Sequence, residues 1–522
     1  PTPTPTPTPT TAKPEGTFDF AVNELGQQTF IPWITYIMDS KTFLPLYDTL
    51  GYPSTKKEIL PGLATRWEFS ADFRTLTLFL QEGVYFHDGW GELTADDVKY
   101  SLEQYMSEVN PQTNAITYRN TIDSIEVIDP YTLVIHQKIA SAALPLAMME
   151  IENSNSSILC KKYLETVGIE EANLHPVGSG PYRLVEVRYG DYCKYEAFDE
   201  HWRVVPEFKY LIIRGVPEES TRVAMLTSGQ IDATNISVLS TPEIPKEGFT
   251  IANWPGAANG FMFFGGMLMP EDDRYIEGYH GQDPWVDVRV REAMNIAIDR
   301  EAINKAICLD TGTQITIPMQ LPGWQDLEPY PFDPERAKQL LAEAGYPNGF
   351  SLDLMRMPAP GAPTFPTEVE AAAGYWEEIG IRVKIIPIEW PAWVPPTVMK
   401  GEDVGTVTTY VYGNLNLAEW FTRLAYFKPD GRWSFYQDAE TWRLADKISA
   451  EVDLEKQEPI YKELSKHLRD NYCFVPFFVG AKIVVSNSQK VGEWPPNWGT
   501  YYFNFEYIRH AQPLNTWRLF TP

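Results

Sequence analysis

The sequence predicts an α/β protein with more than one lobe. Its 522 residues exceed the length that one hydrophobic core usually supports. Segments with strand periodicity alternate along the chain with segments of helical periodicity, and several strand pairs are joined by short turns. Apolar residues make up 44% and charged residues 22% of the chain, the ordinary balance of a globular protein.

The N-terminal part is expected to be rich in hairpins. Residues 17–22 alternate apolar and polar side chains and predict the first strand. Apolar side chains alternate again on both sides of turns at residues 70–72 and 129–130, which predicts two hairpins. Between these hairpins, Thr94 and Asp97 have the spacing of a capping box and mark the start of a helix.

Helices are expected to dominate the later part of the chain. They are predicted at residues 221–228 and from Asp287 onward. The best-marked helix has Asp333 as N-cap and Pro334 at the next position, where a missing N–H costs nothing. One or two amphipathic helices are expected in residues 440–470, and aromatic strands follow them.

The charge balance excludes several classes of partner. The formal net charge is -27, and nucleic acids and anionic membrane surfaces attract clustered Lys and Arg instead. No apolar run reaches the roughly 18 residues that a membrane-spanning helix requires. The composition therefore favours a protein that stays dispersed in water and does not bind nucleic acid.

The chain opens with a Pro-Thr repeat at residues 1–10. Such a tract prefers the extended polyproline II conformation and cannot form a core. We expect residues 1–16 to act as a tether from which an export signal and a lipid-anchoring cysteine have been removed. The alternative is an incidental disordered terminus.

The four cysteines, at positions 160, 193, 308 and 473, lie far apart and contain no CxxC pair. In an oxidising compartment they could form up to two disulfides, and the sequence does not choose the pairing among Cys160, Cys193, Cys308 and Cys473. Buried free thiols are the alternative.

Enzyme motifs lack the partners that catalysis needs. His87 and Asp88 could serve as acid and base, but no nucleophile matches them, so a structural turn is the better interpretation. Asp96 and Asp97 fall at the start of a helix, where carboxylates cap free N–H groups. The chain has no HExxH, no phosphate-binding loop and no GxSxG elbow. We therefore expect no enzymatic activity, no metal site and no cofactor.

Five sequence blocks together resemble a known family. In chain order they are LPGLATRWEFS with EGVYFHDGWGELTADDVKYSLE (60–70 and 82–103), GSGPYRLVE (178–186), ESTRVAMLTSGQID (219–232), DPWVDVRVREAMNIAIDREAI (283–303) and DPERAKQLLAEAGYPNGF (333–350). This order is similar to that of the family-five extracellular solute-binding proteins, the oligopeptide/dipeptide/nickel type.

The resemblance implies a two-lobed periplasmic-binding-protein-like fold with mixed sheets and two crossing segments. The first lobe would comprise residues 17–259 and 486–522, with an inserted subdomain near 51–177, and the second lobe residues 260–485. It also implies the function of an ABC importer's solute-binding subunit. Such a subunit is expected in the periplasm or at the cell surface, as a monomer that closes on a small ligand and delivers it to a membrane permease.

The ligand is left open between a peptide and a sugar oligomer. Peptide binders of this family hold the peptide's amino terminus with an Asp in a segment that corresponds to residues 408–420, and this chain has no Asp there. Asn414 and Asn416 can form hydrogen bonds but cannot neutralise an ammonium group, and Glu419 is the substitute anchor that the segment offers. Residues 259–267 are apolar and aromatic, which suits a neutral or amphipathic ligand. Nickel is disfavoured because these segments carry no His.

Aromatic side chains provide the candidate ligand contacts, because they bury large area at low entropic cost and keep a polar edge. The residues that we expect to line the cleft are Trp390, Trp393, Tyr410, Tyr412, Asn414 and Trp420. For any single Trp, a place in the core is the competing interpretation. Two other functions are the alternatives to a transport subunit: a secreted hydrolase of glycans or peptides, and a sensory module that never meets a permease.

Overall fold

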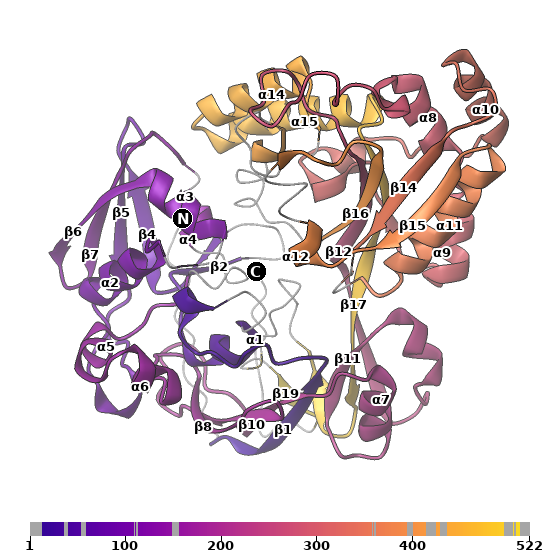
Figure 1. Cartoon of the computed structure of the whole chain (residues 1–522). Helices are drawn as coiled ribbons and strands as arrows, with labels where there is room; N and C mark the ends of the chain where they lie inside the picture. Colours follow the sequence, from indigo (N-terminus) through magenta and orange to yellow (C-terminus); the bar gives the residue numbers. More distant parts are fainter. Residues whose placement is uncertain are drawn as a thin grey trace. The chain divides into compact units, whose positions relative to one another are not determined.

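The computed structural model describes residues 13–35, 40–53, 59–108, 110, 113–142, 144–148, 156–357, 359, 362–393, 400–413, 424–427, 436–494, 505 and 508–511. The chain forms two compact units (Figure 1). Unit 1 contains residues up to Ile236, Ser240–Trp254 and the chain from Ile483 onward, and unit 2 contains Ser237–Leu239 and Pro255–Lys482. The chain passes between the units inside strands β12 (Phe249–Phe264) and β17 (Phe474–Asn487). The predicted α/β class is confirmed.

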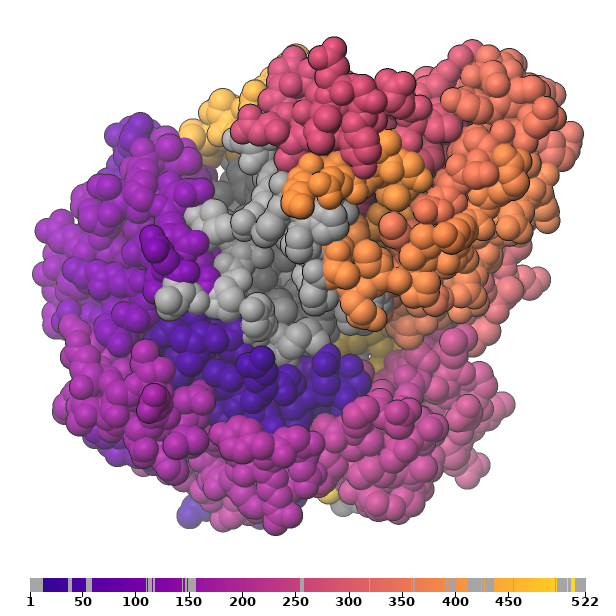
Figure 2. Space-filling view, viewed as in Figure 1, coloured from indigo at the N-terminus to yellow at the C-terminus, as the bar shows by residue number. Residues whose placement is uncertain are grey.

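Unit 1 is built on a mixed sheet. Strand β1 runs parallel to β10 and β11, β10 and β8 flank β9 in antiparallel pairing, and the end of β17 pairs antiparallel with β11. The strands are β1 (Glu15–Val22), β8 (Tyr182–Arg188), β9 (Tyr192–Ala197), β10 (Phe208–Gly215) and β11 (Ala233–Ile236). In the space-filling view, the indigo N-terminal residues lie directly against the magenta residues of the later strands (Figure 2).

A second, antiparallel sheet in unit 1 has the strand order β4-β5-β7-β6. Its strands are β4 (Ala64–Phe69), β5 (Thr75–Leu80), β6 (Ile122–Asp129) and β7 (Thr132–Gln137). Both predicted hairpins are therefore present. Helix α2 (Ala95–Tyr105) begins with the predicted capping box, in which Thr94 and Asp97 cap each other's backbone N–H.

The other described helices of unit 1 are short. They are α1 (Ser40–Phe43), α3 (Thr113–Thr121), α4 (Leu144–Met148), α5 (Lys161–Val167), α6 (Ile169–Leu174) and α7 (Glu219–Thr227), with β2 (Gly51–Pro53), β3 (Ile59–Pro61), β18 (Val491–Glu493) and β19 (Arg509–His510) as further strands.

A buried carboxylate joins three loops of unit 1. Asp48 accepts hydrogen bonds from the Tyr52 hydroxyl at 3.0 Å, the Ser179 hydroxyl at 3.1 Å and the Trp202 indole N–H at 2.8 Å, and the His201 ring lies 3.3 Å away. Burial alone would raise the pKa of Asp48, but His201, Arg203 and these donors hold it near 2. The three loops therefore pack around the ionised carboxylate of Asp48.

Unit 2 has its own sheet section in the order β15-β14-β16-β12. Strand β14 is parallel to both β15 and β16, whereas β16 and β12 are antiparallel. The strands that complete this unit are β13 (Thr313–Gln314), β14 (Ser351–Arg356), β15 (Arg382–Pro387) and β16 (Thr406–Gly413). The helices are α8 (Val288–Ile296), α9 (Arg300–Ile307), α10 (Pro334–Glu343), α11 (Phe365–Glu378), α12 (Trp390–Trp393), α14 (Ala439–Ala450) and α15 (Leu454–Asp470).

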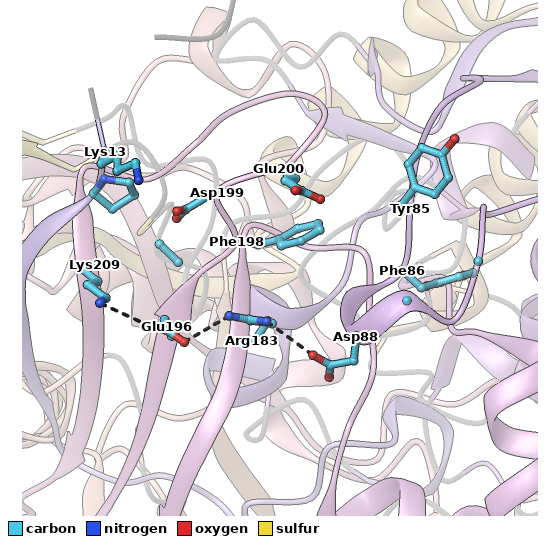
Figure 3. A pocket seen from close by; sticks show the side chains of 14 residues that line it. Lys13, Tyr85, Phe86, Asp88, Arg183, Glu196, Phe198, Asp199, Glu200 and Lys209 are labelled. Carbon is cyan, nitrogen blue, oxygen red and sulfur yellow. Dashed lines mark hydrogen bonds and ion pairs between the residues drawn. The ribbon is translucent and has the colours of Figure 1, made fainter. Parts of the chain in front are cut away.

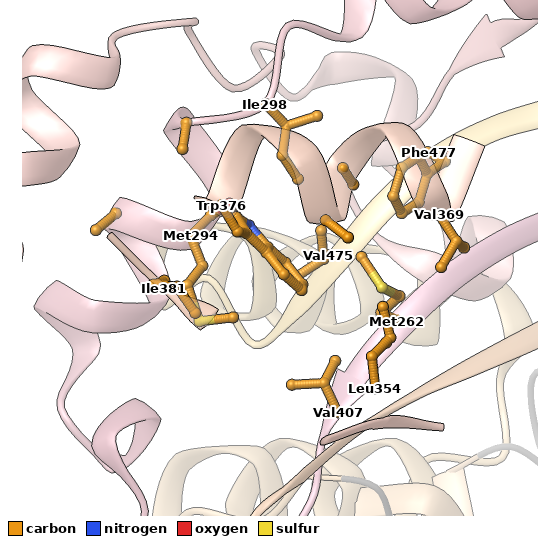
Figure 4. Close-up of a cluster of buried hydrophobic side chains, with 14 of the residues drawn as sticks. Met262, Met294, Ile298, Leu354, Val369, Trp376, Ile381, Val407, Val475 and Phe477 are labelled. Atoms are coloured by element: carbon orange, nitrogen blue, oxygen red, sulfur yellow. Dashed lines mark hydrogen bonds between the residues drawn. The ribbon is translucent and has the colours of Figure 1, made fainter. Parts of the chain in front are cut away.

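Strand β12 separates two hydrophobic clusters of unit 2. Met262 and Phe264 belong to one cluster, and Phe261 and Phe263 belong to the other, as the alternation of strand side chains requires. At the centre of the first cluster is Trp376, which is fully buried (Figure 4). Its indole N–H donates to the backbone oxygen of Met294 at 2.7 Å, so that α11 is tied to α8.

All four cysteines are buried and carry free thiols, so the free-thiol alternative is the one that the structure shows. Burial raises the pKa of Cys160 to about 11 and that of Cys308 and Cys473 to about 12. These thiols therefore stay protonated and unreactive near neutral pH.

Over the described part of the chain, no helix combines the length and the apolar character that a membrane span requires.

Candidate functional site

The two segments that the sequence singled out for ligand binding are neighbouring strands of unit 2. In the antiparallel pair of β12 and β16, Phe261 lies opposite Tyr410 and Asn259 lies opposite Tyr412. The apolar stretch that begins at Asn259 and the stretch that begins at Thr408 are therefore hydrogen-bonded neighbours within one sheet. No charged residue occurs in residues 258–264 or 406–413.

Trp393 and Tyr410 come together in the structure. Their ring centroids are 6.0 Å apart, and Trp393 also lies 6.1 Å from Phe263 in an edge-on arrangement. Tyr410 in turn packs 5.8 Å from Phe261. Trp393 is only 1% exposed, whereas Tyr410 is partly exposed, so Trp393 supports the Tyr410 ring from the core side.

The other predicted contacts are placed only in part. Trp390 lies in α12 and Tyr412 in β16, but their side chains are outside the described part of the structure. Asn414 and Trp420 lie outside the described residues altogether. The six ligand contacts therefore stay a prediction, in which Trp393 and Tyr410 are the members seen side by side.

Polar groups along the strand pair are uncharged. Asn259 and Thr408 are fully buried, and the Thr409 hydroxyl accepts a hydrogen bond from the backbone N–H of Met357 at 2.9 Å. A surface of this kind offers aromatic faces, amides and hydroxyls, which suit a neutral polar ligand better than an isolated charge.

Two carboxylates at the other end of the same strands, Asp283 buried and Asp403 half-buried, escaped the sequence analysis. Asp403 precedes β16 and accepts a hydrogen bond from the Gly266 N–H at 3.0 Å, just beyond the end of β12. Asp283 accepts from the Gly405 N–H at 2.9 Å. Burial raises the pKa of both carboxyls to about 6. The Gly-Gly pair at 265–266 was the signal in the sequence that another backbone group approaches closely there.

Unit 1 carries a surface pocket of about 730 Å³, which contains none of the six predicted contacts (Figure 3). A row of opposite charges crosses its floor. Arg183 lies 3.4 Å from Asp88 and 3.1 Å from Glu196, and Lys209 lies 3.7 Å from Glu196. Because these charges neutralise one another, the row itself offers no uncompensated charge to a ligand.

The His87-Asp88-Gly89 turn beside this pocket has the structural role that the sequence predicted. His87 is buried, its Nδ1 accepts from the Gly178 N–H at 3.3 Å, and its Nε2 donates to the Gly180 oxygen at 2.8 Å. Burial lowers the pKa of His87 to about 4, so the ring stays neutral. Both ring nitrogens are thus engaged by the backbone and unavailable for acid–base chemistry.

Among the described residues, no three His, Cys, Asp or Glu side chains are grouped so that they could hold a metal ion.

Comparison with known proteins identifies the family. The family model described as "Bacterial extracellular solute-binding proteins, family 5 Middle" matches residues 58–432, well over half of the chain. The dipeptide-binding protein of Escherichia coli (strain K12) is 30% identical over 393 residues, which cover 70% of this chain and 69% of that protein. The heme-binding protein A of Haemophilus influenzae is 27% identical over 387 residues, with 68% and 66% covered.

The fold is shared with solved structures. The periplasmic binding protein DppA from Helicobacter pylori, in complex with the peptide STSA, superimposes with a TM-score of 0.74 at 22% identity and covers 96% of this chain and 99% of its own. The predicted two-lobed binding-protein fold is thereby confirmed, and the relatives are binding proteins that perform no catalysis. The chain belongs to the bacterial extracellular solute-binding proteins of family 5.

Proposed function

We propose that this chain is the solute-binding subunit of an ABC importer, which captures an oligopeptide or a sugar oligomer outside the cytoplasm and delivers it to a membrane permease. The observation that carries the proposal is family membership over residues 58–432. In such a subunit, open and closed forms exchange, and the ligand shifts the population toward the closed form.

The two compact units serve as the lobes in this proposal. The boundaries expected from sequence, 259/260 and 485/486, both fall inside the strands β12 and β17 through which the chain passes from one unit to the other. A crossing segment that is a continuous strand can bend and keep its extended backbone conformation, which suits repeated opening and closing.

We place the ligand against the β12–β16 strand pair, with contacts from Trp390, Tyr410, Tyr412, Asn414 and Trp420, and with Trp393, which is 1% exposed, supporting Tyr410 from behind. The lack of charged residues in 258–264 and 406–413 supports a ligand without a charge that needs neutralising at this surface. The relatives named above are described as binding dipeptides and heme, so ligand chemistry varies within the family.

Isothermal titration against a dipeptide, a tetrapeptide and a set of neutral oligosaccharides tests this function, with small-angle scattering recorded on the same samples. We expect one ligand class to bind and to reduce the radius of gyration. Binding without compaction would contradict capture by closure, and a probe that is chemically altered by catalytic amounts of protein would favour the hydrolase alternative instead.

An uptake assay with a permease distinguishes a sensory module from the solute-binding subunit of an importer. If a permease and an ATPase are encoded beside the gene, reconstitution with them should give ligand uptake into vesicles in the importer proposal. Ligand binding and compaction without uptake by any such transporter would favour a sensory module.

We further propose that residues 1–16 form a tether at the outer face of the membrane, because the Pro-Thr repeat favours an extended, semi-rigid conformation. Fractionation of cells that express the natural gene should place the protein with the membrane. Release of all the protein into the soluble extracytoplasmic fraction would contradict an anchored tether.

A further inference from the structure

Asp403, in the loop that precedes β16, bonds to the turn that follows β12, and Asp283, in the segment that precedes α8, bonds to the same loop. The Gly266 N–H donates to Asp403, and the Gly405 N–H donates to Asp283. The backbone N–H of Gly265 donates to the Thr406 oxygen at 2.9 Å and extends the strand ladder up to this point. Each segment thus receives one carboxylate bond, and the β12–β16 pair ends between them.

Asp283 and Asp403 meet at Gly266. Besides its N–H contact with Asp403, Gly266 is so close to Asp283 that a Cβ added to the glycine would lie 2.7 Å from the second oxygen of Asp283, Oδ2. The side chain of Asp283 is 9% exposed, and among the described residues its Oδ2 has no hydrogen-bond partner. A buried carboxylate oxygen in this state is costly when the group is ionised.

The basic side chains near the pair, His280 and Arg274, form their hydrogen bonds with other groups, although both act on the pair through space. His280 accepts the Ile276 N–H on Nδ1 at 2.9 Å, and its Nε2 lies 2.9 Å from the Gly401 oxygen. Arg274 forms a two-pronged contact with Asp272 at 2.9 and 2.8 Å, and its charge lowers the pKa of Asp403 by less than burial raises it. Among the described residues, the remaining titratable neighbours are Tyr279, which adds no positive charge, and Glu402, whose negative charge lies 3.8 Å from Lys400.

We propose that Asp283 and Asp403 form a proton-dependent latch at the loop before β16, which holds this loop to the segment before α8 and to the turn after β12 more firmly in mildly acidic than in alkaline surroundings. The proton adds to a carboxylate oxygen of one aspartate and converts one of two neighbouring like charges, that of the buried Asp283 or of the half-buried Asp403, into a neutral acid. Both N–H contacts survive, because a protonated carboxyl still accepts a hydrogen bond. What changes is the repulsion and the desolvation of the second charge.

The sign of the pH dependence follows from the direction of the shifts. The pKa of each carboxyl is raised to about 6 in the folded chain, first by burial, and the mutual charge adds to this for Asp283. A group with a raised folded pKa contributes stability that is complete below its unfolded pKa of about 4 and is lost as the pH rises through about 6. The latch therefore loosens between pH 4 and roughly pH 7.

Amide hydrogen exchange at Gly266 and Gly405 in the full chain, corrected for the intrinsic pH dependence of exchange, measures the latch directly. In the wild-type chain we expect protection of these two amides to be about tenfold higher at pH 5 than at pH 7.5, since one pKa unit corresponds to a factor of ten. In Asp283→Asn, protection of the Gly405 amide should be high at both pH values, because an amide oxygen still accepts from Gly405 and cannot ionise, whereas Gly266 should keep the pH dependence of Asp403, to which it is bonded.

Thermal unfolding supplies the second measurement and its control. Asp283→Asn should melt above wild type at pH 7.5 and together with wild type at pH 4.5, and the gain should shrink in an Asp403→Asn background. Asp287→Asn is the matched control, because Asp287 caps α8 and is bonded to Arg289, which holds its pKa down, so its loss should lower the melting temperature at pH 7.5.

The latch is overturned if Asp283→Asn melts below wild type at pH 7.5, or if protection of Gly266 and Gly405 is the same at both pH values in wild type. It is also overturned if millimolar Ca²⁺ at pH 7.5 stabilises wild type but not Asp283→Asn, because the pair would then hold a cation in place of a proton.

Discussion

At the scale of single residues, unit 1 depends on buried polar groups whose partners come from distant parts of the sequence. Asp48 joins loops around residues 48–52, 179 and 201–203 and is completely buried. Its charge is compensated by His201 and Arg203 rather than by water. No local pattern in the sequence announces such a group, because its role is set by contacts more than 130 positions away.

Replacement of Asp48 by Asn should destabilise the protein by about 3 kcal/mol at pH 7, because the buried partners lose the charge that they surround. The pKa of Asp48 is held near 2, below its unfolded value, so its contribution is present above about pH 4 and is lost as the pH falls through 2. Urea unfolding of wild type and variant should show a difference that shrinks between pH 4 and pH 3. A constant difference over that range would contradict the charge as its origin.

Two glycines differ in how much space surrounds them, and we expect opposite effects when each is replaced by Ala. At Gly178, an added Cβ would lie 1.9 Å from the Leu46 backbone oxygen, so Gly178→Ala should cost about 1–3 kcal/mol. Gly374 lies on the exposed side of α11 with no atom near the added Cβ, so Gly374→Ala should stabilise by about 1 kcal/mol. Denaturant unfolding of both variants checks the opposite signs, and a loss of stability in Gly374→Ala would refute the second.

At the scale of elements, sequence-based predictions were most accurate where capping side chains mark the start of a helix. Helix α10 begins after Asp333 with Pro334 at its first position, and α2 has its capping box at Thr94, as expected. Strands β12 and β17 were predicted only in part. Both of their faces are buried, so they lack the polar–apolar alternation that reveals the length of a strand.

For the candidate site too, the sequence predicted the local features and missed those that depend on long-range contacts. The aromatic character of the segments around residues 259–267 and 408–420 could be read from sequence, but their antiparallel pairing is a long-range contact that only the fold supplies. The burial of Trp393 and the acid pair at Asp283 and Asp403 depend on that same pairing, and they could not be predicted from spacing alone.

The aromatic contacts make a separate prediction at this scale. Replacement of Tyr412 and Trp420 by Ala should weaken binding of whichever ligand titrates, without loss of folding, because each removes a flat surface from the proposed cleft. Trp376→Phe is the comparison variant: it removes the bond to Met294 and should lower stability while affinity is kept. Titration and thermal unfolding on the same preparations separate the two effects, and unchanged affinity in Tyr412→Ala with Trp420→Ala would refute the placement.

At the scale of the whole molecule, the two units differ in how the chain builds them. Almost all of unit 2 comes from one continuous stretch, Pro255–Lys482, whereas unit 1 is assembled from segments on both sides of it. Strand β11 of unit 1 pairs with the end of β17, where Ala233 lies opposite Ser486. The sheet of unit 1 is therefore completed only by residues close to the C-terminus.

This discontinuity sets an order of events during biosynthesis. A polypeptide that leaves the ribosome or the export channel from its N-terminus can finish its second unit while the first still waits, with one side of β11 uncovered, for residues 483–487 to emerge. An uncovered strand edge invites pairing with other chains, so this interval is the one in which a nascent molecule most needs a chaperone.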